Sequence, residues 1–267
     1  MSDYFKNINE INYEGPESDN PLSFKYYDEN KQVLGKTMKE QLRFATCYWH
    51  TFTWPGLDPF GGATFDRPWM SGSDPLKMAE TKLDVAFDFF TKIKTPFFCF
   101  HDRDISPEGT SYKETQKNFL HIVDLMESKM ESTNVKLLWG TANAFSHKRY
   151  MSGASTNPDP EVFAYKAAQV KDCMDATMRL GGQNYVLWGG REGYETILNT
   201  DMTKETANLQ RFLELQISQV LKHLVFVEKR FRVLPRFQSL RFRRVLPLIQ
   251  RAFELCFEVE SVWRQGP

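Results

Sequence analysis

The sequence predicts an α/β fold with about the first four βα units of a (β/α)8 barrel, and three observations lead to this prediction. From about residue 44, short apolar runs alternate with long amphipathic segments. The runs are almost continuously apolar, as in parallel strands that helices cover on both faces. Four such units follow one another, and their right-handed succession fits half of a barrel.

The first unit consists of a predicted strand, Phe44–Phe52, and a predicted helix over 74–94, separated by the Gly- and Pro-rich loop "PGLDPFGGATFDRP". Asp74 followed by Pro75 makes a favourable N-cap and first turn. Apolar residues then recur mostly at steps of three and four, which predicts a helix: Leu76, Ala79, Leu83, Ala86, Phe87 and Phe90.

Three more units of the same kind follow. The predicted strands are "TPFFCFHD", "VKLLWGTAN" and "NYVLWGG". The predicted helices cover 110–132, 160–182 and the segment from Thr203 to about Val220, and a glycine pair closes the second of them.

Length and composition limit the class of protein. A chain of 267 residues with 41% apolar and 25% charged residues can bury a large core, and α/β barrels reach this length as one domain. A net charge of zero argues against nucleic acid or membrane as the main partner. The polar N-terminus predicts no secretory signal, and no run reaches the roughly 18 apolar residues of a membrane span. Four widely spaced cysteines favour free thiols in a cytoplasmic protein over a zinc site.

Aromatic and polar residues stand at the end of every predicted strand, where the catalytic groups of a barrel lie. They are Trp49 and His50, His101 and Asp104, Trp139 and Thr141, and Trp188 with Arg191 and Glu192. No packing rule requires this arrangement, so it predicts an active-site mouth.

His101 is the most informative of these residues. An imidazole can accept or donate a proton near neutral pH, and a neighbouring carboxylate fixes its tautomer and orientation. Asp104 follows three residues later, where a loop can turn its side chain back toward the ring, and Asp102 can pair with Arg103 or with a neighbouring loop. The alternative is a structural role, in which His101 caps the strand and hydrogen-bonds a backbone carbonyl.

Trp49, Trp139 and Trp188 each close a different strand. A single tryptophan is more often core, but three at equivalent positions favour a pocket whose flat apolar walls suit the C–H faces of a sugar. The segment "WGGREGYE" lacks both GxGxxG and GK[ST], which argues against nucleotide binding. The aromatic side chains of the loop that contains Phe60 and Phe65 are expected to be covered, either by the loop's own barrel or by a partner subunit.

Four segments together resemble the xylose isomerase family, in its class with the longer N-terminus, over about residues 1–215. They are "RFATCYWHTFTWPGLDPFGGATFDRPW", "FFCFHDRDISPEG", "KLLWGTAN" and "NYVLWGGREGYETILNTDM". The resemblance implies a (β/α)8, or TIM, barrel that interconverts D-xylose and D-xylulose, and also glucose and fructose, by a hydride shift. It implies two divalent metals, Mg²⁺, Mn²⁺ or Co²⁺, which would polarise both sugar oxygens.

The resemblance also implies roles for individual residues and an assembly. His101 looks like the family's active-site histidine, which binds the sugar and helps to open its ring, and Asp104 looks like the carboxylate that orients it. Phe60 resembles the aromatic residue that neighbouring subunits insert into each other's sites, which implies a homodimer or homotetramer. The expected pocket wall comprises Trp49, Trp139, Thr141 and Trp188.

The family pattern stops near residue 215. The carboxylate motifs that hold the family's metals belong to the second half of its barrel and do not occur in this sequence, and Glu228 alone cannot replace them. Residues 1–220 are therefore expected to form the N-terminal half of a barrel domain. Residues 221–267 carry ten basic and four acidic side chains, and they are expected to be a non-family tail. A frameshift, mis-splicing or faulty gene model accounts for this tail better than a basic amphipathic segment does.

Three functions remain open from the sequence. The first is an active aldose–ketose isomerase, and the second is a truncated, inactive remnant without the metal-binding half. The third is a metal-dependent nuclease of related fold, which the near-neutral body and missing ligand sets disfavour. Half a barrel would also leave the fourth strand as an open edge and expose apolar surface, unless the tail or another chain covers it, so poor solubility is expected.

Overall fold

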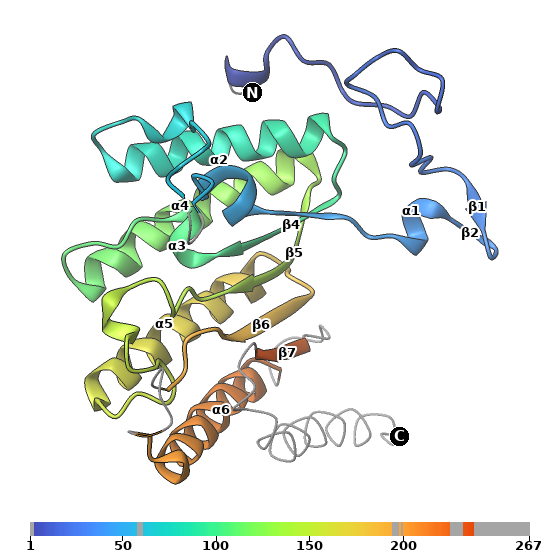
Figure 1. Cartoon of the computed structure of the whole chain (residues 1–267). Helices are drawn as coiled ribbons and strands as arrows, with labels where there is room; N and C mark the ends of the chain where they lie inside the picture. The colour runs from blue at the N-terminus through green and yellow to red at the C-terminus, as the bar shows by residue number, and fades with distance from the viewer. Residues whose placement is uncertain (1–2, 58–60, 194–197, 199, 225–231, 238–267) are drawn as a thin grey trace. The chain divides into compact units, whose positions relative to one another are not determined.

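A computed structural model describes residues 3–57, 61–193, 198, 200–224 and 232–237 (Figure 1). The helices are α1 (Met38–Gln41), α2 (Pro75–Lys92), α3 (Asp102–Ile105), α4 (Tyr112–Thr133), α5 (Pro160–Arg179) and α6 (Met202–Leu224). The strands are β1 (Gln32–Val33), β2 (Lys36–Thr37), β3 (Ala45–Cys47), β4 (Phe97–His101), β5 (Lys136–Thr141), β6 (Asn184–Gly189) and β7 (Arg232–Phe237). Short 3₁₀ turns lie at Asp3–Phe5, Pro68–Met70 and Lys148–Tyr150.

The chain divides into two compact units, and each is described by itself. The first comprises Met1–Gly140 and Ala176–Gly182, and the second comprises Thr141–Asp175 and Gln183–Pro267. Within the first unit the strand order is β3-β4-β5, and β3 pairs in parallel with β4, with Cys47 opposite Cys99. The prediction of an α/β fold with parallel strands is thereby confirmed.

The helix α2 begins and ends as the sequence predicts. The Asp74 carboxylate accepts hydrogen bonds from the backbone N–H groups of Leu76 and Lys77, at 2.9 and 3.2 Å. The buried face of α2 carries large apolar side chains such as Leu83 and Phe90. Helices α2 and α4 pack against each other, and α4 contributes Phe119, Ile122, Val123 and Met126 to the core.

The predicted strand Phe44–Phe52 is only partly right. Strand β3 ends at Cys47, and Trp49–Thr53 form a single π-helical turn. In an extended chain, residues 48 and 52 would stand roughly 13 Å apart, whereas the rings of Tyr48 and Phe52 are 5.2 Å apart and both are buried. The turn therefore lets two large aromatic side chains enter the same core.

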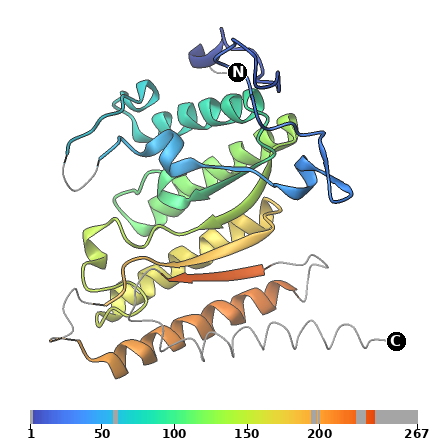
Figure 2. The same ribbon diagram turned by 45° about the vertical axis from the view of Figure 1, so that its right-hand side comes forward.

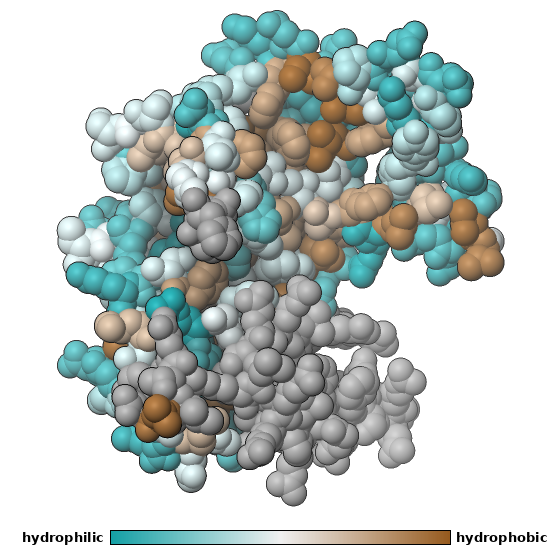
Figure 3. All heavy atoms as spheres, in the orientation of Figure 1, coloured by the Kyte–Doolittle hydropathy of each residue, from teal (hydrophilic) through white to brown (hydrophobic). Residues whose placement is uncertain are grey.

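An N-terminal arm, residues 3–44, precedes β3 and was not assigned any element from the sequence. Its start is anchored by the ring of Phe5 against Phe89 and by a hydrogen bond from the Ile11 N–H to the Lys92 carbonyl. Farther along, the β1–β2 hairpin exposes Leu34 at its tip. Figure 3 shows hydrophobic residues scattered among hydrophilic ones on the face drawn.

The second unit contains β6 and β7, which run parallel (Figure 2). The pairing extends from Asn184 opposite Arg232 to Gly189 opposite Phe237. The sequence predicted an open edge at the fourth strand unless the tail or another chain covers it. The structure shows the first of these exceptions: a segment of the tail pairs with this strand along its full length, so the backbone N–H and C=O groups of the strand have partners on that side.

Candidate functional site

His101 is the last residue of β4, a strand that is buried on both faces. Phe98 and Phe100 are fully buried, and His101 itself is 9% exposed. The chain then makes one helical turn, α3, rather than the predicted loop. Because residues three apart lie on the same side of a helical turn, Asp104 returns to His101, and His101 Nδ1 lies 2.6 Å from Asp104 Oδ2.

This contact fixes the histidine ring. A carboxylate accepts hydrogen bonds and does not donate them, so the proton of the pair lies on His101 Nδ1. The ring is held in one orientation, and its Nε2 atom is the nitrogen that proton exchange with another group would use. The partner of Nδ1 is thus the Asp104 carboxylate, whereas the sequence also allowed a structural histidine that hydrogen-bonds a backbone carbonyl.

Two tryptophans stand beside the histidine in the first unit. The ring of Trp49, on the π-helical turn, is centred 4.4 Å from that of His101 and inclined to it by 51°. The Trp139 ring lies 5.5 Å from that of Trp49. Both indoles are half-buried. An imidazole oriented by a carboxylate, beside an apolar wall of half-buried rings, is an arrangement that suits proton transfer in a region of low water access.

Asp102 and Arg103 pair with each other and with the following loop, as the sequence allowed. The Arg103 N–H donates to Asp102 Oδ1 at 2.9 Å. The Arg103 guanidinium lies 3.5 Å from Asp102 Oδ2 and 3.8 Å from Glu108 Oε2. These charges therefore stabilise the turn that carries Asp104.

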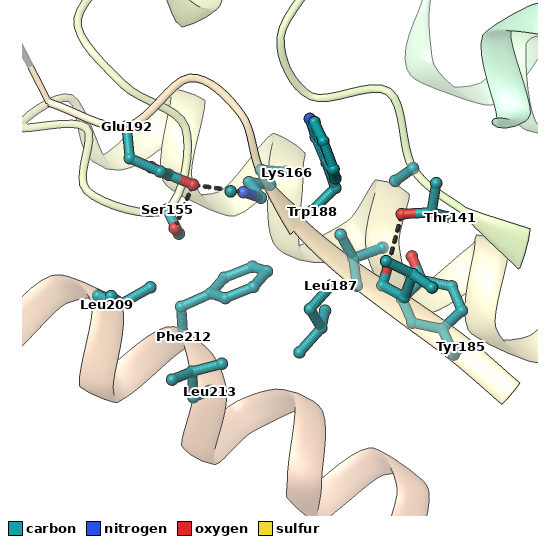
Figure 4. Close-up of a pocket in the computed structure, with 14 residues that line it drawn as sticks. Thr141, Ser155, Lys166, Tyr185, Leu187, Trp188, Glu192, Leu209, Phe212 and Leu213 are labelled. Atoms are coloured by element: carbon teal, nitrogen blue, oxygen red, sulfur yellow. Dashed lines mark hydrogen bonds and ion pairs between the residues drawn. The ribbon is translucent and has the colours of Figure 1, made fainter. Parts of the chain in front are cut away.

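Thr141 and Trp188 belong to the second unit, where both line a hollow between β6 and α6 (Figure 4). The Thr141 hydroxyl donates a hydrogen bond to the Val186 carbonyl. From α6, Leu209, Phe212 and Leu213 form the opposite apolar wall. The cavity measures about 20 Å³, which is room for about one water molecule and not for a sugar.

A buried ion pair at the same hollow was missed in the sequence. Lys166 Nζ lies 2.7 Å from Glu192 Oε1 (Figure 4). The Glu192 carboxylate also accepts from the hydroxyls of Ser155 and Thr156 and from the N–H groups of Ala154 and Thr156. Burial raises the pKa of Glu192, but the Lys166 charge and these hydrogen bonds outweigh it, so the net shift of this pKa is downward.

One sequence signal could have revealed this pair. Lys166 lies on the buried stripe of α5, between Phe163 and Val170, where a charged side chain needs a partner. Its partner Glu192 is 26 residues away in the chain, and no local motif connects the two. Glu192 itself was noted only as one of the polar residues after a strand.

The remaining predicted site residues fall in different places. Phe60 lies outside the described residues. Trp188 is in the second unit, so the idea that three indoles wall one pocket stays a prediction. In the aromatic loop, Phe65 is 47% exposed with the Arg67 guanidinium over its ring. Trp69, by contrast, is buried and donates its indole N–H to the Phe52 carbonyl.

The described residues do not fit a site for two divalent metals. Within the ranges given above, no group of three or more His, Cys, Asp or Glu side chains is placed to hold a metal ion. Two buried carboxylates near the strand ends are engaged, Asp104 by His101 and Glu192 by Lys166. In the same part of the chain, no helix is long and apolar enough to cross a membrane.

Comparison with known proteins identifies relatives of one kind. No family model matches the chain. A xylose isomerase of Photobacterium profundum is 58% identical over 225 residues, which is 84% of this chain and 51% of the relative. Xylose isomerases of Paraburkholderia phytofirmans and Allorhizobium ampelinum are also 58% identical, over 82% and 80% of this chain and 50% and 49% of their own lengths. The chain thus belongs, over about four-fifths of its length, to the xylose isomerase family, and it spans about half the length of the curated relatives it matches.

Proposed function

We propose that this chain is part of an aldose–ketose isomerase that interconverts D-xylose and D-xylulose. The names of its relatives support the reaction class. The observation that carries the proposal for this chain is the 2.6 Å contact between His101 Nδ1 and Asp104 Oδ2, beside the ring of Trp49. A fixed imidazole next to an apolar aromatic wall suits a polyhydroxylated substrate whose ring must open.

In this proposal His101 and Asp104 are the catalytic residues. Opening a cyclic sugar requires a proton to leave the anomeric hydroxyl and a proton to reach the ring oxygen. His101 Nε2 is the atom that would exchange a proton with the sugar, while Asp104 keeps Nδ1 protonated and the ring oriented. Trp49 and Trp139 would pack against the sugar's C–H faces, as would Trp188, and they would exclude water. Thr141 and Phe60 complete the proposed substrate-binding set.

A second candidate function is a catalytically inactive isomerase remnant. Two observations favour it: the chain spans about half the length of its relatives, and its described residues contain no metal-binding group. Such a chain would keep the His101–Asp104 pair and weak sugar affinity without completing the hydride shift. The family's two divalent metals would then require residues that this part of the chain does not supply.

One assay separates the two candidates. The purified full chain is incubated with D-xylose and with Mg²⁺, Mn²⁺ or Co²⁺ in turn, and D-xylulose is measured. An active enzyme gives product that His101→Asn abolishes, whereas His121→Asn, a change at a half-exposed histidine of α4 bonded to Glu80, leaves it unchanged. Quenching of tryptophan fluorescence by xylose without product favours the remnant. If neither product nor quenching is seen, the active enzyme is ruled out, and so is a remnant that binds sugar by itself.

The proposal includes a chain boundary and an assembly. We infer that the barrel half ends near residue 220, that the segment 221–267 arises from a change of reading frame or splicing, and that the protein acts in the cytoplasm as a homodimer or homotetramer. The identity to relatives over 214 to 225 residues supports the boundary. Sequencing the transcript across codons 205–225 tests it, because a restored frame should encode the family's missing carboxylate motifs.

A further inference from the structure

Lys82 is a charged residue in a place where charge is costly. It lies on the buried face of α2 and is 5% exposed. Among the described residues, its ammonium has one hydrogen-bond partner, the Thr53 hydroxyl at 3.3 Å. A buried ammonium has three donors and needs partners or a counter-charge to be stable. The ammonium of Lys82 therefore calls for a compensating charge nearby.

The charge that favours the protonated form of Lys82 is that of Asp104, although the two side chains form no direct ion pair in the described chain. Burial lowers the pKa of Lys82 to about 8, while the charge of Asp104 raises it. Thr53 connects the two residues by hydrogen bonds as well, since its hydroxyl accepts from Lys82 Nζ and donates to the Asp104 carbonyl at 3.4 Å. Asp104 in turn holds His101. A continuous set of contacts thus runs from Lys82 through Thr53 to the histidine.

Tyr48 is a further buried polar residue close to Lys82. Its ring centre is 6.0 Å from Lys82 Nζ, and its hydroxyl is buried without a hydrogen-bond partner in the described chain. The pKa of Tyr48 is raised well above its usual value, first by burial and then by the charges of Asp104 and Asp84. Asp84 itself is bound 2.6 Å from Lys129 of α4. The titratable groups around Lys82 are therefore Asp104 on α3 and Tyr48 before the π-helical turn, with the Asp84–Lys129 pair one step farther away.

We propose that Lys82 is a positioning residue, whose buried ammonium holds Asp104, and through it the His101 ring, in the geometry for proton transfer. Lys82 touches neither the substrate nor the reacting atoms. The inference rests on the proposed function only in taking His101 as the proton-handling group. A merely structural lysine would stabilise the π-helical turn against α2 but would have no effect on the charge pair. The two roles therefore differ in a measurable way.

The first experiment measures the titration of Lys82 itself. The full chain is labelled with ¹³C,¹⁵N-lysine, and the Lys82 signal is assigned by its loss in Lys82→Met. We expect a midpoint near pH 8, lowered by about one pH unit in Asp104→Asn because the favourable charge is gone. Asp84→Asn, which removes a carboxylate from α2 but leaves Asp104 in place, is the matched control and should leave the midpoint unchanged.

The second experiment observes the histidine. In Lys82→Met, the ¹⁵N signal of His101 Nδ1 should move because its partner Asp104 has lost its support, while the signal of His121, bound to Glu80, should stay. A midpoint of Lys82 that is unmoved by Asp104→Asn, or moved equally by Asp84→Asn, overturns the proposal. So does an unchanged His101 signal in a folded Lys82→Met chain. If Lys82→Met does not fold, Lys82→Arg, which also removes the lysine signal but keeps the positive charge, supplies the assignment, and the Asp104→Asn titration then decides.

Neither experiment uses a sugar or a metal. A failure of the xylose assay therefore leaves the coupling of Lys82 to Asp104 measurable. Conversely, absent coupling would disprove the role of Lys82 and leave the proposed isomerase reaction untouched.

Discussion

The two units of the chain each bury an acid–base pair near the end of a strand, and the two pairs differ in how fully they are satisfied. His101 and Asp104 are 2.6 Å apart, and Lys166 and Glu192 are 2.7 Å apart. The Glu192 carboxylate accepts from Lys166 and from four further donors. In the described chain, the Asp104 carboxylate accepts only from His101, and the imidazole faces a half-buried indole.

Under the proposed function, this difference separates a structural pair from a catalytic one. A buried carboxylate whose acceptor sites are all used is stabilised in its ionised form and binds the loop 153–157 to the chain after β6. A carboxylate with one partner orients the imidazole without filling its own remaining acceptor sites, as the proposed catalytic pair requires. Equal distances therefore do not imply equal roles.

The largest expected effect on stability is that of removing one member of the Lys166–Glu192 pair, in which the carboxylate has five donors and is thus saturated. Lys166→Met leaves the Glu192 charge buried without its counter-charge, and it should lower the free energy of unfolding by about 3–5 kcal/mol. Urea unfolding midpoints measure this. Lys171→Met breaks a pair of similar length with Asp175 on the same helix, but at a half-exposed site, and should cost less than about 1 kcal/mol. Equal losses in the two variants would contradict the distinction.

Lowering the pH should gradually remove the stability that the ionised Glu192 carboxylate contributes. Because the pKa of Glu192 is lowered in the folded chain, its contribution to stability is present above the unfolded-state pKa of about 4.3 and is lost as the pH falls through the folded-state pKa. The wild-type urea midpoint should therefore fall between pH 5 and about pH 3 more steeply than that of Glu192→Gln. Parallel curves for the two proteins would show that Glu192 does not titrate in this way.

The sequence predicted the four long helices and three strands of residues 74–224 well, because each helix buries a long, periodic apolar face and each strand is a nearly continuous apolar run. The failures come from segments where tertiary packing decides the backbone. The turn at Trp49–Thr53 exists because Tyr48 and Phe52 enter one core, and β7 exists as the partner of β6. Neither fact is encoded in the periodicity of the segment itself.

The candidate site shows the same division. The contact between His101 and Asp104 was predictable because they are three positions apart at the end of a strand, although the sequence predicted a loop there and not the helical turn. Lys82 and Lys166 were not identified, since each is a single lysine in an amphipathic helix. Whether such a side chain reaches solvent or a buried polar partner depends on residues far away in the chain, Thr53 for Lys82 and Glu192 for Lys166.

A smaller effect on stability is expected for the His101–Asp104 pair, whose carboxylate accepts from one donor in the described chain. His101→Asn removes one hydrogen bond to a charged group and should lower the free energy of unfolding by about 1–3 kcal/mol. The same variant should abolish xylulose formation in an active chain. Circular dichroism and urea unfolding check the first effect. A loss as large as that of Lys166→Met would mean that this pair, too, is mainly structural.

The smallest effect tests whether distance alone sets the energy of an ion pair. Arg179 bridges two carboxylates of α4, with Nη1 2.7 Å from Asp124 and Nη2 2.6 Å from Glu127. These contacts are as short as that of Lys166 with Glu192, and they are two in number. The Arg179 side chain is 42% exposed, however, so water solvates the charges in both folded and unfolded states. Arg179→Ala should therefore cost less than about 1 kcal/mol in urea unfolding. A cost near that of Lys166→Met would show that burial and saturation are not what distinguishes the pairs, and the assignment of Glu192 to structure would lose its basis.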